Sequence, residues 1–301
     1  MAIQTVRAQV NGQWYTLSYN SQNGKYEASI TAPGQTSYNL PGGYYNVTVE
    51  ATNTAGTTGT ADASTLEGLK LYVHETVAPV ITILSPSSGA HVANAQQPVV
   101  FTVTDETGGS GVDLDSVVVE LDGVQASASE ITHSTITNGY SFTYTPSQAM
   151  GDGPHTVTVN ASDNDGNAAA EKSTTFTVDT VPPALNITAP AEGEIFATST
   201  VAYAGTTNDA TSSPVTIAIT LNGNPQTAPT VSGGAFSGSF TGLSDGAYTA
   251  VFKATDAAGK SSSVTRNFTV DTSVPQIISA SITPNPVDAG QTMLISVEVS
   301  G

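Results

Sequence analysis

The sequence predicts an all-β chain made of repeated units, each of them the size of a domain. Apolar and polar residues alternate with a period of two along the chain, and Gly, Asn, Asp and Pro interrupt this alternation at strand-length intervals. No segment shows a sustained helical period. The phrase Phe-Thr-Val-Asp-Thr occurs at residues 176–180 and again at 268–272, each time after a similar strand. Repeats with this spacing indicate domains and not the short units of a solenoid.

Length and repeat spacing together predict three domains and a short C-terminal segment. A chain of 301 residues holds two or three domains, and the spacing of the repeated phrases favours three. We place an aromatic-rich N-terminal β-sandwich at residues 1–78, an acidic domain at 79–181 and a further domain at 182–274. Residues 275–301 form a two-strand C-terminal segment.

The first domain begins as a meander. The expected strands are residues 5–10, 13–19 and 25–30. Asn11-Gly12 suits a two-residue hairpin turn between the first two strands, and the second turn ends in Asn23-Gly24. Residues 43–51 repeat, more loosely, the strand that precedes each Phe-Thr-Val-Asp-Thr phrase.

The second and third domains share a different plan, in which an apolar strand A ends at a proline and is followed by strands B and C. In the second domain we expect these strands at residues 80–86, 99–104 and 117–123. In the third domain we expect them at residues 185–190, 201–205 and 215–223. About seven short strands in a unit of this size is typical of an immunoglobulin-like sandwich. The predicted fold class is therefore all-β, with tandem immunoglobulin-like β-sandwiches in an elongated array.

Two further phrases carry a resemblance to a known family. Residues 161–167 read Ala-Ser-Asp-Asn-Asp-Gly-Asn and residues 254–260 read Ala-Thr-Asp-Ala-Ala-Gly-Lys, at the expected end of strand F. With the two Phe-Thr-Val-Asp-Thr closers, they resemble the bacterial immunoglobulin-like (Big-type) domains found in tandem in adhesins and phage structural proteins. The resemblance covers the second and third domains well and the first domain weakly.

The start of the chain is more similar to Gram-positive phage and prophage proteins that carry such domains than to cell-wall adhesins. Met1 is followed by neither a basic start nor an apolar export segment, and residues 3–19 read as strands. The resemblance implies a structural protein of the virion, associated with its tail, that displays its domains for adhesion to the host surface. The alternatives are a bacterial cell-surface adhesin or stalk, and an accessory module of a carbohydrate-active enzyme.

The chain is acidic, and the acidic residues are concentrated in the second domain. The formal net charge is −18, and residues 79–182 hold twelve acidic side chains against Lys172 alone. Such a field repels phosphate backbones and attracts cations, which argues against nucleic-acid binding. Because the chain has no cysteine, no disulfide joins its domains and no thiolate serves as a nucleophile. No segment approaches the length of a membrane helix.

Acidic residues in the expected loops form two candidate calcium sites at the domain junctions. In this topology the linker that enters a domain meets its B–C and F–G loops. The first junction gathers Glu75, Asp105, Glu106, Asp113, Asp115, Asp163 and Asp165. The second junction gathers Asp179, Asn208, Asp209 and Asp256. The candidate ligands are Asp105, Asp113, Asp115, Asp163, Asp165, Asp179, Asp209 and Asp256.

Calcium accepts six to eight hard oxygen ligands in flexible geometry, which suits such a group. The alternative is that Asp-x-Asp-Gly-Asn at residues 163–167 makes a tight turn and the other acids are solvated loop residues. The sequence contains neither an EF-hand nor a nonapeptide calcium motif, so the prediction rests on the expected proximity of the acids.

Aromatic residues are unevenly distributed. The only Trp and seven of the eleven Tyr fall in the first domain. If Tyr15 and Tyr19 face the core, strand alternation leaves Trp14 exposed, as a ligand-binding residue for a glycan or a partner protein. The alternative is that these aromatics fill the core of a small domain. Tyr45, His155 and Tyr248 stand in phase two residues after a strand-entry glycine, which predicts a tyrosine corner.

No catalytic constellation appears, because the four histidines are scattered and no nucleophile elbow or phosphate-binding loop is present. We therefore predict a protein that is not an enzyme, located on the virion surface or on a bacterial cell surface. The C-terminal segment matches strands A and B of a further sandwich at residues 277–282 and 293–299.

An isolated hairpin is marginal in water and its edges invite pairing. We expect the C-terminal segment to add strands to another virion structural protein or to another copy of the chain, and the first domain is the alternative contact with virion proteins. The alternatives are that the array continues beyond this sequence or that the hairpin folds back on the third domain.

Overall fold

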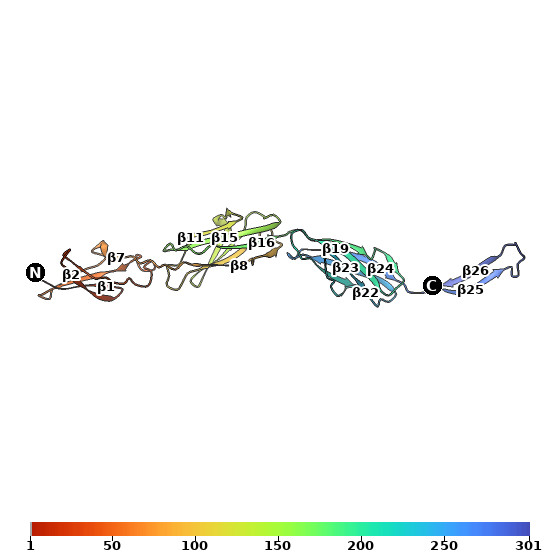
Figure 1. Cartoon of the computed structure of the whole chain (residues 1–301), viewed down its shortest axis with the longest axis horizontal. Helices are drawn as coiled ribbons and strands as arrows, with labels where there is room; N and C mark the ends of the chain where they lie inside the picture. The colour runs from red at the N-terminus through yellow and green to blue at the C-terminus, as the bar shows by residue number, and fades with distance from the viewer. Residues whose placement is uncertain (1) are drawn as a thin grey trace. The chain divides into compact units, whose positions relative to one another are not determined.

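The computed structural model describes residues 2–301 and confirms an all-β chain (Figure 1). In those residues the helical elements are two 3-10 turns, Glu67–Leu69 and Ala128–Glu130. The chain divides into two compact units, Met1–Ala90 with Ala95–Thr177 and His91–Asn94 with Val178–Gly301. The first unit holds the first domain and most of the second, and the second unit holds the third domain and the C-terminal segment.

The first domain is one antiparallel sheet with a small additional pair of strands. Its strands are β1 (Ile3–Val10), β2 (Gln13–Asn20), β3 (Lys25–Glu27), β4 (Tyr45–Asn46), β5 (Thr48–Asn53), β6 (Thr58–Ala61) and β7 (Lys70–Leu71). The sheet order is β3-β2-β1-β5-β6, and β4 pairs with β7 alone. The expected meander is present, but the first domain lacks the pair of large sheets found in the other two.

The turn between β1 and β2 is the expected two-residue hairpin turn. Asn11 and Gly12 have φ values of 45° and 78°, the left-handed conformations that such a turn requires. This turn sets the register in which Val6 faces Leu17 and Ala8 faces Tyr15. Val6 and Ala8 are buried, so this face of the sheet is the core face.

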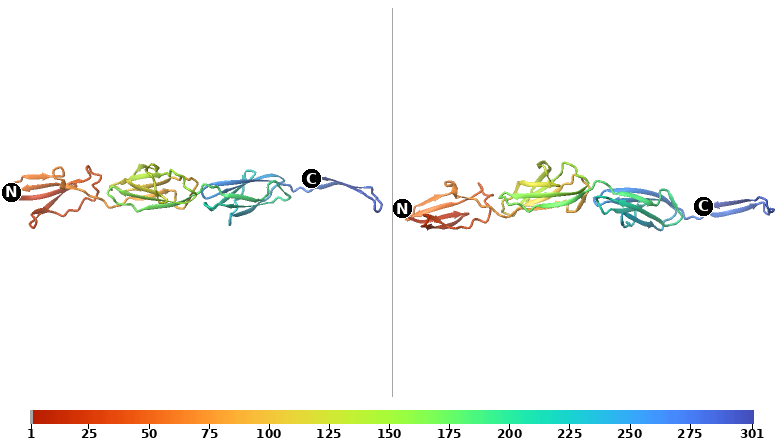
Figure 2. Two further views of the ribbon diagram at one scale, coloured as in Figure 1. Left: turned by 90° about the horizontal axis from the view of Figure 1, so that it is seen from above. Right: turned by 45° about the horizontal axis from the view of Figure 1, so that its top comes forward.

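The second domain is a two-layer sandwich, and its layers can be followed in both views of Figure 2. Its strands are β8 (Val80–Ser85), β9 (Ala90–Val92), β10 (Val99–Thr104), β11 (Val112–Leu121), β12 (Val124–Gln125), β13 (Ile131–Ile136), β14 (Gly139–Tyr144), β15 (Gly153–Asp163) and β16 (Lys172–Val178). One sheet has the order β13-β14-β10-β8 and the other β12-β11-β15-β16-β9. This strand order is that of an immunoglobulin-like sandwich, with A, B, E and D in one sheet and C, F and G in the other.

The third domain repeats this arrangement. Its strands are β17 (Ala184–Ala189), β18 (Glu194–Phe196), β19 (Val201–Asn208), β20 (Thr216–Leu221), β21 (Asn224–Pro225), β22 (Ala235–Phe240), β23 (Gly246–Thr255) and β24 (Ser261–Val270). The sheets have the orders β17-β19-β22 and β18-β24-β23-β20-β21. The sequence prediction of tandem immunoglobulin-like sandwiches is therefore confirmed for the second and third domains.

The repeated phrase marks the last strand of each sandwich because it supplies core residues. Phe176 and Val178 in β16 are almost fully buried, as are Phe268 and Val270 in β24. The two residues are two positions apart, so both point to the same face of the strand. Burying a Phe and a Val together contributes about 4 kcal/mol of hydrophobic free energy, which explains why both domains use the same pair.

The three residues expected to form a tyrosine corner each bond back to the chain. The Tyr248 hydroxyl donates to the carbonyl of Ser244 at 2.9 Å, and the Tyr45 hydroxyl donates to the carbonyl of Gln35 at 3.1 Å. In the second domain His155 takes this place, with Nε2 2.8 Å from the carbonyl of Gly151. The prediction of a structural role for His155 is confirmed.

The C-terminal segment is a hairpin of β25 (Gln276–Thr283) and β26 (Leu294–Ser300) that forms a sheet of two strands. Ile295 and Val297 face Ile282 and Ala280 across the hairpin. The equivalent pairs in the second domain, such as Phe101 with Ile83, belong to the two-sheet sandwich, where Phe101 is fully buried. In the hairpin Ile295 and Val297 are 57% and 52% exposed, so the hairpin presents the core face of an A–B pair without a second sheet.

The environment of His155 predicts a pH-dependent contribution to the stability of the second domain. Burial alone lowers the pKa of His155, but its hydrogen bonds to the Gly151 carbonyl and to the Asp122 carboxylate, 2.7 Å from Nδ1, raise the pKa overall. A raised folded-state pKa stabilises the fold fully below the unfolded-state value of about 6.5. This stabilisation is lost as the pH rises through the folded-state pKa.

We expect the wild-type second domain to lose stability above about pH 6.5, whereas His155→Tyr loses less over the same range because a tyrosine hydroxyl can bond to Gly151 without titrating. The measurement is urea unfolding followed by NMR signals of β15 amides at several pH values. Identical pH profiles for the two proteins would contradict this role of His155.

Candidate metal centres

Two groups of carboxylates meet in the structure. The first consists of Glu75, Asp105 and Glu106, and the second of Asp179, Asp209 and Asp256. In each group one oxygen of every side chain lies within 4.8 Å of the oxygens of the other two. Carboxylates this close repel one another unless a cation or protons compensate their charge.

Matching strands position the two groups. Asp105 directly follows β10, and Asp209 directly follows β19, the equivalent strand B of the third domain. Glu75 and Asp179 come from the segments that lead into β8 and β17. Asp256 directly follows strand β23, so the second group contains all three contributions expected from the topology: the linker, the B–C loop and the F–G loop.

Several carboxylate oxygens in these groups are buried without a hydrogen-bond donor. The backbone N–H of Gly111 donates to Oδ2 of Asp105 at 2.7 Å, but Oδ1 of Asp105 has no donor. Oε2 of Glu106 also lacks a donor. In the second group the N–H of Lys260 donates to Oδ1 of Asp256 at 2.8 Å, and Oδ2 has none. A buried charged oxygen without a partner is costly, and a cation bound to it removes that cost.

The first group lacks a positive side chain to balance it. In residues 2–301 no Lys or Arg forms an ion pair with Glu75, Asp105 or Glu106. Burial and the neighbouring Asp105 carboxylate raise the pKa of Glu106 to about 7. Burial and the carboxylates of Asp163 and Asp105 raise the pKa of Glu75. These raised values are the electrostatic signature of acids that are packed together without compensation.

The loop after Asp105 encloses the first group closely. A side chain at Gly109 would place its Cβ 2.6 Å from Oδ2 of Asp105 and 2.8 Å from Cδ of Glu106. A larger residue at this position would therefore displace one or both carboxylates from their present positions. The close approach keeps bulky side chains out of the space in which a cation would contact them.

The remaining predicted ligands have other surroundings. Asp165 accepts hydrogen bonds from the Thr36 hydroxyl at 2.5 Å and from the Glu75 N–H at 3.0 Å, so it fastens the linker and a loop of the first domain to the second domain. Asp163 accepts from the side chain of Asn167 at 2.8 Å and lies next to Glu75.

Asp113 and Asp115 lie in β11, outside the group, where Oδ1 of Asp113 accepts the N–H of Asp115 at 3.0 Å. Glu75 and Glu106, which the sequence placed at this junction, complete the group instead. Neither Glu75 nor Glu106 belongs to a sequence motif, so only the expected geometry of the domain junction could indicate that they join this group.

Trp14, the predicted ligand-binding residue, is half-buried. The guanidinium carbon of Arg7 lies 4.2 Å from the centre of the indole ring, and Arg7 also pairs with Glu50 at 2.6 Å. One face of the indole is therefore covered by a cation. Tyr19 is 58% exposed and packs against Tyr26, so the condition on which Trp14 was expected to be exposed is not met by this tyrosine.

Comparison with protein families assigns two of the domains. Residues 86–180 match the family model of the bacterial Ig-like domain, and residues 183–272 match that of glucodextranase, domain B. No curated protein matches the chain.

Comparison with solved structures matches the chain to several proteins, including the three that follow. The fibronectin(III)-like modules of Clostridium thermocellum CbhA are 15% identical, with 64% of this chain and 94% of that chain covered and a TM-score of 0.42. A structure of a 1.5-MDa bacterial ice-binding adhesin is 22% identical, with 89% of this chain and 86% of that chain covered and a TM-score of 0.35. The Bacteroides ovatus protein SGBP-B, solved with a mixed-linkage heptasaccharide, is 13% identical, with 95% of this chain and 69% of that chain covered and a TM-score of 0.24.

The strand orders and the match at residues 86–180 define this chain as a protein of tandem immunoglobulin-like domains. No helix in residues 2–301 is both long enough and apolar enough to cross a membrane. The acidic groups at the domain ends are the most distinctive chemical feature of these domains.

The donor-free oxygens predict that neutralising one acid has opposite effects with and without a cation. In chelator, Asp105→Asn should raise the free energy of unfolding of the second domain by about 1 kcal/mol, because it removes charge repulsion and keeps an oxygen for the Gly111 N–H. In calcium the same variant should be less stable than the wild type. Urea unfolding in both buffers measures the two effects, and Asp288→Asn in the exposed C-terminal turn is the control. A loss of stability in chelator would show that Asp105 is satisfied without a cation.

Proposed function

We propose that this chain is a non-catalytic display protein whose tandem immunoglobulin-like domains are stiffened by calcium at the two acidic groups. The observation that carries this proposal is the set of buried carboxylate oxygens without donors in both groups, on Asp105, Glu106 and Asp256. Both groups occupy the same topological place, after strand B and beside the incoming linker.

The ligand chemistry favours calcium. Each group offers only carboxylate oxygens, which are hard ligands, and none of its members is a histidine or cysteine. Calcium accepts carboxylates together with backbone carbonyls and water in irregular geometry, whereas magnesium requires a near-ideal octahedron. Glu75, Asp105 and Glu106 would hold the first ion, and Asp179, Asp209 and Asp256 the second.

Such ions would act on the linkers. Glu75 lies between the last strand of the first domain and the first strand of the second, and its N–H already bonds to Asp165. A cation shared by Glu75 and the B–C loop residues Asp105 and Glu106 would add a second contact between the linker and the second domain. Fixing the linker in this way lowers its conformational freedom, so that domains displayed on a surface keep their spacing.

We further propose that the display surface is that of a phage particle, with a position at the tail. The F-strand phrases at residues 161–167 and 254–260 resemble Big-type domains found in tandem in adhesins and in phage structural proteins, so they support display on a surface and are compatible with this placement. Arrayed copies would convert weak contacts with host glycans or proteins into avidity. The bacterial cell surface is the alternative location. The match of residues 183–272 to domain B of glucodextranase favours, as a second candidate, an accessory module of a carbohydrate-active enzyme.

The C-terminal hairpin is the proposed attachment segment. In the two sandwiches, the strands equivalent to β26 are β10 and β19. Each pairs with strand A on one edge and with a further antiparallel strand, β14 or β22, on the opposite edge. In residues 2–301, β26 pairs with β25 on one edge and has no strand partner on the opposite edge. We propose that an extended segment of another virion structural protein occupies it and covers Ile295 and Val297.

Calcium should raise the melting temperature of both sandwich domains, because it binds the folded state only. At a calcium concentration one hundred times the dissociation constant the gain is about 2.7 kcal/mol per site. Differential scanning calorimetry with calcium and with chelator measures it. Asp105→Asn should remove the shift of the second domain alone and Asp256→Asn that of the third, while Asp288→Asn should retain both. Equal melting curves in the two buffers would reject the proposal.

The attachment role of the hairpin predicts that a chain lacking residues 276–301 keeps its three folded domains but is lost from the particle. Immunogold labelling of purified virions and of producing cells, compared for full-length and shortened chains, tests both the location and the attachment. Wild-type labelling of virions by the shortened chain would reject the hairpin as the attachment, and labelling confined to the cell surface would select the alternative location.

A further inference from the structure

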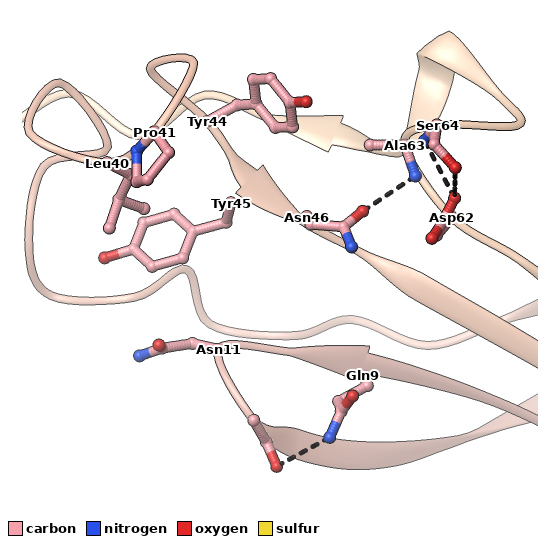
Figure 3. A pocket seen from close by; sticks show the side chains of 11 residues that line it. Gln9, Asn11, Leu40, Pro41, Tyr44, Tyr45, Asn46, Asp62, Ala63 and Ser64 are labelled. Carbon is pink, nitrogen blue, oxygen red and sulfur yellow. Dashed lines mark hydrogen bonds between the residues drawn. The ribbon is translucent and has the colours of Figure 1, made fainter.

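A hollow of about 440 Å³ opens in the first domain, away from both acidic groups. It lies beside the β1–β2 turn and β4 (Figure 3). The residues that matter for its chemistry are Gln9, Tyr44, Tyr45, Asn46 and Asp62. Its size falls in the range of small-molecule sites, which are clefts of roughly 300–1,000 Å³.

Two amides in the wall are held in fixed orientations. Oδ1 of Asn46 accepts the backbone N–H of Ala63 at 2.9 Å, which leaves Nδ2 as a donor. Nε2 of Gln9 donates to the carbonyl of Gly12 at 3.2 Å, which leaves Oε1 as an acceptor. Figure 3 shows Nδ2 of Asn46 turned away from Ala63, toward the strand that carries Gln9. The hollow therefore offers a donor and an acceptor whose positions are set by the backbone.

A carboxylate supplies a further acceptor. Oδ1 of Asp62 accepts from the N–H of Ser64 at 2.9 Å and from its hydroxyl at 2.5 Å. These two bonds hold the carboxyl group in one orientation and lower its pKa. The Thr65 N–H and hydroxyl also lower the pKa of this carboxyl group, and a carboxylate has enough lone pairs to accept a ligand hydroxyl as well.

Aromatic rings form the apolar part of the wall. Tyr45 is buried, and its hydroxyl is fixed on the Gln35 carbonyl, so its ring cannot swing away. Tyr44 lies against Tyr72 with ring centres 6.1 Å apart. Rigid rings beside fixed donors and acceptors match a ligand that has both C–H faces and hydroxyl groups.

The charges around the hollow disfavour ionic ligands of either sign. The lining contains no Lys, Arg or His, and the chain carries a net charge of −18, so an anionic ligand is repelled. The Lys70 ammonium lies 5.0 Å from the centre of the Tyr44 ring and pairs with Glu67 at 2.8 Å. This ammonium takes the cation position on Tyr44, which disfavours a cationic ligand.

From these observations we propose that the hollow lined by Gln9, Tyr44, Tyr45, Asn46 and Asp62 binds a neutral carbohydrate. A sugar hydroxyl accepts from Asn46 Nδ2, and others donate to Gln9 Oε1 and to Asp62. Gln9 lies directly opposite Trp14 in the β1–β2 register. Trp14, the only Trp of the chain, is therefore next to a lining residue without lining the hollow itself, so its fluorescence can change when a ligand binds. The inference names the ligand class for the proposed display function, but it does not use the calcium groups.

The test is an NMR titration of the full chain with four neutral trisaccharides, maltotriose, cellotriose, laminaritriose and N,N′,N″-triacetylchitotriose, up to about 10 mM, since a site of this size binds weakly. The controls are trigalacturonate and trilysine. We expect at least one neutral trisaccharide to shift the side-chain amide signals of Asn46 and Gln9 and to change the Trp14 emission. Binding should be the same in calcium and in chelator, so its outcome is separate from that of the calcium proposal.

Isosteric variants decide whether the hollow is responsible. Asn46→Asp keeps the acceptor for Ala63 but removes the donor, and Asp62→Asn keeps the acceptor for Ser64 but removes the charge. Each should weaken binding at least about tenfold, which corresponds to about 1.4 kcal/mol. Asn224→Asp, which adds the same charge in the exposed strand β21 of the third domain, should bind like the wild type. The proposal is overturned if none of the four sugars binds, if only a charged control binds, or if both variants bind sugar like the wild type.

Discussion

Uncompensated negative charge at the end of each sandwich where the linker enters is the constraint on which the account of this protein depends. The sheets themselves are stabilised by apolar packing, with Phe101 stacked on Phe142 at 5.0 Å in one domain and Tyr203 beside Phe240 at 4.9 Å in the other. Packing of this kind gains nothing from an acidic group. Carboxylates buried without donors oppose folding unless a ligand offsets them, and their presence at the same place in two domains is the basis of the calcium proposal.

This constraint connects the fold to the proposed function. Strand B ends at the same place in both sandwiches, and an acid follows it directly, Asp105 in one and Asp209 in the other. The linker residue that meets it changes from Glu75 to Asp179, yet both carry a carboxylate. The proposed cation at each site would make the stiffness of the linkers depend on the calcium concentration around the chain.

Much of the fold could be predicted from the sequence because two signals are local. Alternation identified the A and B strands β8, β10, β17 and β19, and the repeated phrase located the buried Phe of strands β16 and β24. The first domain was less predictable, since its sheet order joins β1 to β5 across a long irregular segment. The members of the two acidic groups were predicted only in part. The expected junction geometry correctly placed Asp105 and Asp256 in the two acidic groups, but Asp113 lies in strand β11 and is not part of the first group. The hollow in the first domain depends on side-chain hydrogen bonds of Asn46 and Gln9, which no sequence pattern predicts.

The most direct test of the central claim is the number of calcium ions that the purified full-length chain binds, measured by isothermal titration calorimetry after removal of metals by chelator. The account predicts two sites per chain, with one lost in Asp105→Asn and the other lost in Asp256→Asn. Failure of the wild-type chain to bind calcium at millimolar concentration, or binding that survives both substitutions together, would contradict it.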